Sequence, residues 1–274
     1  MGRIEEAIRK ARADQQGSVG HGTGSSLARR YDDRTRRGDE DSVPSEAREP
    51  TIPQSNIVKA DRKHLREHRV IAASEHDERV GPYRQLRTLV LKTMRDNNWM
   101  TLAITSAHEG AGKTLTSANL AIALSKDLNT TVLLVDLDLK KPSVHEILNL
   151  HPEKGLVDFL EGRAELEEIL FSPGIDRLTV LAGRSAGKYS SELLASPRMK
   201  GLMRDLCQQA ATNITIFDLP PLLRNDDAIL FAPYADATLL VVEDGVTTEN
   251  ELQQSLHLLS KTNVIGTILN KARI

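Results

Sequence analysis

From about residue 82 onward, short runs of apolar, mostly β-branched residues alternate with stretches of helical periodicity. Strands are predicted at 100–105, 131–135, 178–181, 214–217, 238–242 and 264–269. Helices are predicted at 83–95, 113–126, 191–210 and 250–261. Continuous apolar strands that alternate with amphipathic helices are typical of a mainly parallel sheet covered on both faces. The pattern predicts a doubly wound α/β domain over residues 81–274.

The first 80 residues follow a different pattern, with 22 apolar and 31 charged residues. Ile4, Ala7, Ile8 and Ala11 are spaced as on one face of a helix, so residues 1–14 are predicted to form a short amphipathic helix. Its narrow apolar stripe fits either a solvated terminal helix or a docking element for a partner. Residues 15–80 mix Gly, Ser, Pro and both signs of charge, and are predicted to form a flexible charged linker.

Composition narrows the class of protein further. A net charge of −2 argues against a nucleic-acid partner, and the single cysteine excludes a disulfide framework and fits a reducing compartment. No apolar run approaches the roughly 18 residues that a membrane span needs, and the N-terminus has no signal-peptide pattern. A cytoplasmic protein with no membrane span of its own is therefore expected.

A glycine-rich segment, SAHEGAGKT, joins the first predicted strand of the domain to the next helix. Such a turn points several backbone N–H groups inward at the positive end of the helix dipole, which is a phosphate-binding geometry. Lys113 can reach the β- and γ-phosphates of a nucleotide, and the Thr114 hydroxyl can bind Mg²⁺. The phosphate-loop pattern G-x-x-x-x-G-K-[ST] is met except at its first position, Ala107. The predicted nucleotide-binding residues in this segment are Gly110, Ala111, Gly112, Lys113, Thr114 and Leu115.

Three aspartates follow two other predicted strands. Asp136 comes directly after the apolar run at 131–135, with Asp138 one residue further on, and Asp218 comes directly after the run at 214–217. The carboxyl ends of strands line the ligand crevice of a doubly wound sheet, where a carboxylate can hold Mg²⁺. A helix-capping role would explain one aspartate of the pair but not both.

These motifs, in this order, resemble those of the bacterial tyrosine kinases, within the larger P-loop group that includes the MinD and ParA ATPases. The segments MGRIEEAIRKA, YRQLRTLVLKTM and WMTLAITSA are similar to those of kinases encoded with exopolysaccharide synthesis genes. The resemblance implies a P-loop NTPase fold and an ATP- and Mg²⁺-dependent protein tyrosine autokinase that regulates exopolysaccharide biosynthesis or export. It also implies a membrane-bound chain-length-determinant or activator protein as partner, a peripheral location at the inner membrane, and a homo-oligomer.

The resemblance also implies roles for individual residues. Lys113, Asp136 and Asp138 would be catalytic, with either aspartate as the base, while Thr114, Asp136 and Asp218 would surround Mg²⁺. Asn270 falls where related ATPases contact adenine, although a structural role in a turn fits it nearly as well.

Two departures from the family pattern keep alternatives open. The motif E-x2-R-x2-R, which such kinases use to assemble a ring, has Gly81 in place of its glutamate, and the chain lacks a C-terminal tyrosine cluster. Of the four tyrosines, Tyr31 in the predicted linker is the candidate phosphoacceptor. A non-catalytic ATP-binding regulator is the first alternative. A MinD/ParA-like ATPase is the second, disfavoured because His108 stands where those proteins place a second lysine.

Overall fold

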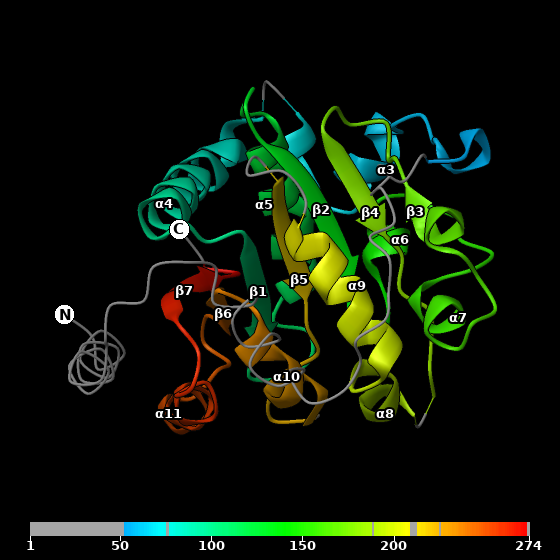
Figure 1. Ribbon diagram of the computed structural model, residues 1–274. Helices are drawn as coiled ribbons and strands as arrows, with labels where there is room; N and C mark the ends of the chain where they lie inside the picture. The colour runs from blue at the N-terminus through cyan, green and yellow to red at the C-terminus, as the bar shows by residue number, and fades with distance from the viewer. Residues whose placement is uncertain (1–51, 75–76, 188, 209–212, 225, 273–274) are drawn as a thin grey trace.

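The computed structural model describes residues 52–272 except 75–76, 188, 209–212 and 225 (Figure 1). The predicted N-terminal helix, Tyr31 and most of the predicted linker lie outside the described residues.

A single seven-stranded sheet forms the centre of the domain, in the order β3-β4-β2-β5-β1-β6-β7. Every pairing is parallel except that of β3 with β4. The strands are β1 Thr101–Ser106, β2 Thr131–Asp136, β3 Leu170–Phe171, β4 Leu178–Leu181, β5 Asn213–Asp218, β6 Ala237–Glu243 and β7 Val264–Asn270. The prediction of a doubly wound, mainly parallel sheet of P-loop NTPase type is confirmed. Sequence periodicity missed β3, because two residues are too few to show one.

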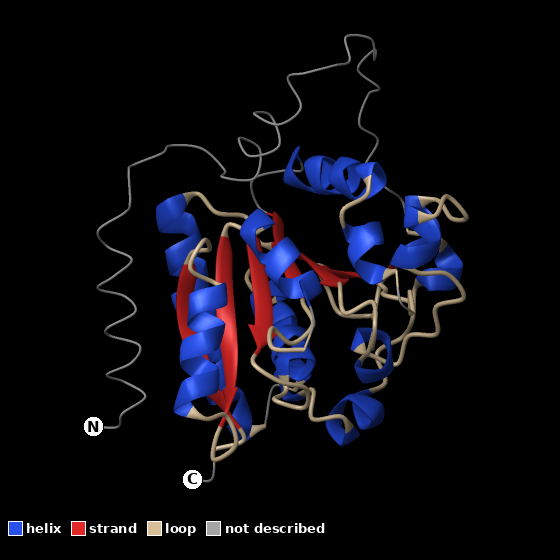
Figure 2. Ribbon diagram, turned by 90° about the horizontal axis from the view of Figure 1, so that it is seen from below, coloured by secondary structure: helices blue, strands red, loops and turns tan. Residues whose placement is uncertain are grey.

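Helices cover both faces of the sheet, as Figures 1 and 2 show. One face packs against α3 Arg62–Glu67, α4 Gly81–Asn97, α5 Lys113–Ser125 and α6 Val144–Ile147. The other packs against α7 Leu156–Leu160, α8 Ser190–Leu194, α9 Pro197–Gln208, α10 Asp226–Phe231 and α11 Glu249–Leu258. Short 3-10 turns complete the described chain at Gln54–Asn56, Ile71–Ala73, Glu78–Val80, Leu166–Ile169 and Ala232–Tyr234. Two separate apolar cores result, one on each face. None of the helices in this part of the chain has the length and apolar character needed to span a membrane.

The helix predicted at 191–210 is wrong as a single element, since the structure divides it into α8 and α9. Pro197 disfavours a helical conformation at Ser196 and begins the second helix instead. The Ser196 hydroxyl accepts a hydrogen bond from the Met199 amide at 3.2 Å, as an N-terminal cap does.

The prediction of a flexible linker over residues 15–80 also needs correction where its C-terminal part is described. Residues 52–74 and 77–80 are packed on the domain, with Leu65, Val70, Ala72 and Val80 buried. The Val58 amide donates to the Ser172 carbonyl beside β3 at 2.9 Å. The segment thus provides enough apolar side chains to pack on α4 and α5. Its many charged residues give it the overall composition of a linker, so composition alone did not indicate this packing.

Asn119, in the middle of α5, fastens this segment to the domain. Its side chain accepts a hydrogen bond from the Ala72 amide at 2.9 Å and donates to the Arg69 and Leu115 carbonyls at 3.2 and 2.9 Å. Asn119 and Ala72 are fully buried, so removal of the side chain leaves the Ala72 amide without a partner in the interior.

We expect Asn119→Ala to lower the free energy of unfolding by about 2 kcal/mol, because the buried Ala72 amide loses its partner and the Arg69 carbonyl loses a second hydrogen bond. Urea unfolding measures the loss, with Asn129→Ala at an exposed turn as the matched control. A change below about 0.5 kcal/mol, the usual range for surface substitutions, would show that Asn119 does not anchor the segment.

Candidate nucleotide-binding site

The predicted phosphate loop lies between β1 and α5, and its shape depends on two glycines. Gly110 and Gly112 have φ angles of 80° and 91°, which side-chain-bearing residues rarely adopt. The helix α5 begins at Lys113, so Lys113, Thr114 and the half-buried Leu115 form its first turn. Backbone N–H groups in the first turn of a helix have no partner within the helix. The loop therefore has the conformation that phosphate binding requires.

Asn270, at the end of β7, closes the loop from the other side. Its side chain donates a hydrogen bond to the Ala111 carbonyl at 2.8 Å. A Cβ atom added to Gly112 would lie 2.0 Å from the Asn270 amide nitrogen. The structure thus brings the predicted adenine-contact residue against the phosphate loop.

Lys113 is surrounded by the predicted acidic residues. Its ammonium lies 2.9 Å from an Asp138 oxygen and 3.7 Å from an Asp218 oxygen, with all three side chains buried. Burial by itself lowers the pKa of Lys113, but the Asp218 and Asp138 carboxylates outweigh it and raise that pKa. The ammonium therefore stays charged and neutralises part of a negative cluster.

Asp218 is held by hydroxyl groups of α5. Thr114 Oγ1 donates to one carboxylate oxygen at 2.6 Å, and Ser117 Oγ donates to the other at 3.0 Å. Burial raises the pKa of Asp218, against the lowering effect of Lys113 and of these two hydroxyls. Thr114 and Asp218, both predicted as metal-site residues, are in direct contact.

Asp136 has different surroundings from Asp138. It is fully buried and accepts hydrogen bonds from the backbone amides of Asp138, Ser143 and Val144 at 3.2, 2.9 and 3.0 Å. Burial raises the pKa of Asp136 to about 8 and the Asp218 carboxylate adds to this, while the Val144 amide acts in the opposite direction. Asp136 fixes the loop after β2, whereas Asp138 faces Lys113.

Sequence reasoning missed two residues of the site, Ser117 and Gly183. A Cβ atom added to Gly183 would lie 2.9 Å from Asp136 Cγ, so only glycine permits this packing. Ser117 stands three residues after Thr114, which places both hydroxyls on one side of α5. That spacing was visible in the sequence. The Gly183 contact was not, because it joins the loop after β4 to the end of β2.

The charges at this site fit a bound cation. The buried carboxylates of Asp138 and Asp218 face the single ammonium of Lys113, so the cluster carries an excess of negative charge that Mg²⁺ would offset. Among the described residues, no group of three His, Cys, Asp or Glu side chains is arranged to hold a metal alone. A metal ion here therefore needs oxygen ligands from the nucleotide and water as well.

A glycine loop at a helix N-terminus, a lysine and a hydroxyl beside it, and acidic residues at the adjacent strand ends define a P-loop nucleotide-binding domain. The family described as "CobQ/CobB/MinD/ParA nucleotide binding domain" (CbiA) matches residues 102–274. Tyrosine-protein kinase YwqD of Bacillus subtilis is 33% identical over 194 residues, covering 70% of this chain and 81% of that protein. The chain belongs to the bacterial tyrosine-protein kinase family within this nucleotide-binding group.

Other relatives are longer proteins. Tyrosine-protein kinase etk of Escherichia coli K12 is 30% identical over 196 residues, which cover 71% of this chain and 27% of that protein. A putative tyrosine-protein kinase in the cps region of Klebsiella pneumoniae is 31% identical over 206 residues, which cover 74% of this chain and 28% of that protein.

Solved structures agree with this assignment. The kinase domain of Escherichia coli ETK superposes with a TM-score of 0.69 at 26% identity, covering 80% of this chain and 89% of that one. The cell division ATPase MinD of Pyrococcus furiosus gives a TM-score of 0.53 at 26% identity, covering 62% of this chain and 71% of that one.

Proposed function

We propose that this chain is an ATP- and Mg²⁺-dependent protein tyrosine kinase that acts on itself and regulates exopolysaccharide biosynthesis or export. The observation that carries the proposal is the contact of Lys113 with Asp138 and Asp218 at the phosphate loop, in a chain of the tyrosine kinase family. The kinase in the cps region of Klebsiella pneumoniae supports the connection with polysaccharide synthesis.

In the proposed reaction, the oxygen of a tyrosine hydroxyl forms a bond to the γ-phosphorus of ATP, and the bond from that phosphorus to the β,γ-bridging oxygen breaks. Lys113 and the loop amides hold the phosphates in line and offset the developing charge. The tyrosine proton passes to a carboxylate, and ADP leaves.

We propose Asp138 as that carboxylate and Asp136 as a residue that positions its loop. Asp138 lies beside the Lys113 ammonium, whereas Asp136 is engaged by three backbone amides. Mg²⁺, when bound beside Thr114, Asp218 and Asp136, would supply charge neutralisation at the phosphates. Asn270 and the loop residues Gly110 to Leu115 are the proposed nucleotide contacts.

Tyr31 is the proposed phosphoacceptor. Among the described tyrosines, Tyr189 is 70% exposed, while Tyr83 and Tyr234 are half-buried. Tyr31 is followed by Asp32 and Asp33 in a polar segment. Incubation of the full chain with Mg·ATP is expected to label Tyr31, and Tyr31→Phe should remove most of the phosphotyrosine signal.

Phosphopeptide mapping measures this, with Tyr83→Phe as the matched control. Phosphotyrosine at Tyr189 with an unmodified Tyr31 would contradict the choice of acceptor. ATP binding without any phosphotyrosine would contradict the kinase proposal in favour of a nucleotide-dependent regulator. Phosphate release to water without protein labelling would favour a MinD/ParA-like ATPase, to which His108 remains the objection.

The proposed partner is a membrane-bound chain-length-determinant or activator protein of a polysaccharide export system, which would hold the chain at the inner membrane. The resemblance to kinases of such systems supports this partner. Co-sedimentation with membranes that contain the partner, but not with membranes that lack it, tests the assignment. A homo-oligomer is also proposed, because both arginines of the ring motif, Arg84 and Arg87, are present.

A further inference from the structure

Asp227, in the first turn of α10, is a buried carboxylate that the proposed reaction does not use. None of its surface is exposed to solvent. One carboxylate oxygen accepts a hydrogen bond from the Ser191 hydroxyl of α8, whereas the other has no hydrogen-bond partner among the described residues. A buried carboxylate oxygen without a hydrogen bond lowers stability, so packing alone does not explain this residue. The dipole of α10 does not explain the burial either, because Asp226 meets the same dipole from an exposed position.

Lys140, in the loop after β2, contacts the second oxygen of Asp227. Its ammonium lies 3.8 Å from Asp227 Oδ2, and its side chain is 34% exposed, so the lysine extends from the surface to a fully buried charge. Holding a long, flexible side chain in one conformation costs entropy. Attraction to a buried carboxylate can offset this cost, because water screens it less than it screens a surface pair. Lys140 is thereby held to α10.

Lys140 belongs to a tight turn that carries Asp138, the proposed base. The Lys141 amide donates to the backbone carbonyl and to one carboxylate oxygen of Asp138, at 3.1 and 3.0 Å. The other Asp138 oxygen contacts the Lys113 ammonium at 2.9 Å. Lys140 lies inside the turn that the Lys141 amide closes. The contact between Lys140 and Asp227 therefore anchors the turn whose hydrogen bonds orient the Asp138 carboxylate.

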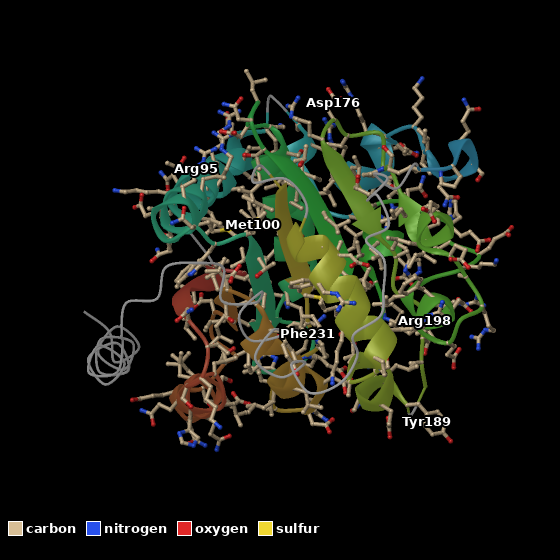
Figure 3. The ribbon with its side chains drawn as sticks, viewed as in Figure 1. Arg95, Met100, Asp176, Tyr189, Arg198 and Phe231 are labelled. Carbon is tan, nitrogen blue, oxygen red and sulfur yellow. The ribbon has the colours of Figure 1, made fainter. Side chains whose placement is uncertain are left out.

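A second contact joins the same turn to the loop before α8. The Leu139 carbonyl accepts a hydrogen bond from the Ala186 amide at 2.8 Å. Helix α8 in turn packs against α10 and donates a hydrogen bond to Asp227. Figure 3 labels Tyr189, directly before α8, and Phe231, the last residue of α10, both in the lower half of the view. Asp227 thus lies where α8, α10 and the turn after β2 meet.

We propose that Asp227 is a positioning residue for phosphoryl transfer, which through Lys140 holds the 138–141 turn so that Asp138 can accept the proton of the acceptor tyrosine. The inference rests on the proposed function, in which Asp138 is the base. A base must lie within hydrogen-bond distance of the proton that it accepts, and a displacement of about 1 Å can lower the rate about 100-fold. Nucleotide binding depends mainly on the phosphate loop and should be nearly independent of Asp227.

The first test measures the turn itself and needs no kinase activity. Asp227→Asn keeps the shape of the side chain but removes its charge, and it should speed hydrogen exchange of the Lys141 amide roughly ten-fold or more in the full chain. Lys140→Gln should have the same effect, whereas Lys140→Arg keeps the charge and should leave the exchange rate within about three-fold of wild type. Asp205→Asn and Lys200→Gln, at exposed positions of α9, are the matched controls and should exchange as the wild type does. Exchange is followed by NMR.

The second test measures the rate of phosphotyrosine formation as a function of ATP concentration. Asp227→Asn should lower the maximal rate roughly 10- to 100-fold, while the KM for ATP and the affinity for ADP stay within about two-fold of wild type. Lys140→Arg should recover most of the rate that Lys140→Gln loses. A role in folding alone would instead reduce labelling and ADP binding together.

Wild-type exchange of the Lys141 amide in both Asp227→Asn and Lys140→Gln would overturn the inference. A loss of labelling that is matched by a loss of ADP affinity, or that Asp205→Asn reproduces, would also overturn it. If Asp227→Asn does not fold, Lys140→Gln at a partly exposed position supplies both measurements. A wild-type chain that forms no phosphotyrosine would contradict the kinase proposal, whereas unchanged exchange would contradict anchoring by Asp227, so the two failures remain distinguishable.

Discussion

Lys113→Ala is expected to reduce phosphotyrosine formation to background, roughly 100- to 1,000-fold, because the reaction would lose the cation that we propose for charge stabilisation at the transferred phosphoryl group. The ammonium is also the nearest cation to Asp138 and Asp218, at 2.9 and 3.7 Å. Its removal leaves buried carboxylates without their partner, which typically costs about 3–5 kcal/mol of stability. Labelling with Mg·ATP and thermal unfolding measure the two effects separately.

Two further variants distinguish catalysis from folding. Lys113→Arg keeps a positive charge near Asp138 and Asp218 and should retain the fold, but it displaces the donor and should still lose most of the labelling. Lys200→Ala, at an exposed position of α9, is the control for loss of a lysine and should label normally. Labelling of Lys113→Ala at the wild-type rate would exclude the phosphate loop as the catalytic site.

Gly112→Ala should destabilise the chain by about 3 kcal/mol and abolish detectable nucleotide binding, whereas Gly110→Ala should cost about 1–2 kcal/mol. Both glycines have positive φ angles, of 91° and 80°, so both alanines are strained. Only the Cβ at position 112 meets another residue, 2.0 Å from the Asn270 amide nitrogen. Asn270 must then rotate away and break its hydrogen bond to Ala111.

A double-mutant cycle isolates that contact. In an Asn270→Ala background there is no amide for the new methyl group to displace, so Gly112→Ala should cost no more than Gly110→Ala. Urea unfolding and ADP titration measure all the variants. If the difference between the two glycines persists without Asn270, the collision with Asn270 is not its cause.

The sheet and the phosphate loop were predictable because both depend on local sequence. Every strand except the antiparallel edge strand β3 is an apolar run long enough to recognise, and the loop is a contiguous motif. The acidic residues could be assigned to strand ends for the same reason. The sequence could not predict which partner each aspartate contacts, because that depends on how the chain turns after β2. The Asp136 carboxylate accepts hydrogen bonds from the backbone amides of Ser143 and Val144, whereas the Asp138 carboxylate contacts the Lys113 ammonium.

The packed segment before α4 was the principal error, and its cause is physical. Leu65, Val70 and Ala72 are few, and they are separated by charged residues that remain in solvent. The average composition of such a segment is that of a flexible linker. Burial depends instead on whether a complementary surface exists, and Asn119 supplies hydrogen bonds that composition cannot reveal.

The close approach of Gly174 to this segment fixes where the autonomous folding unit starts. Its φ angle is 71°, and an added Cβ would lie 2.5 Å from the Val58 carbonyl oxygen and the Ala60 nitrogen. Main chain thus lies directly on main chain at the edge of the sheet. A truncated version that starts at residue 81 would lose Leu65, Val70 and Ala72, which pack with α5 in one apolar core. Expression of the catalytic unit by itself should accordingly start no later than residue 52.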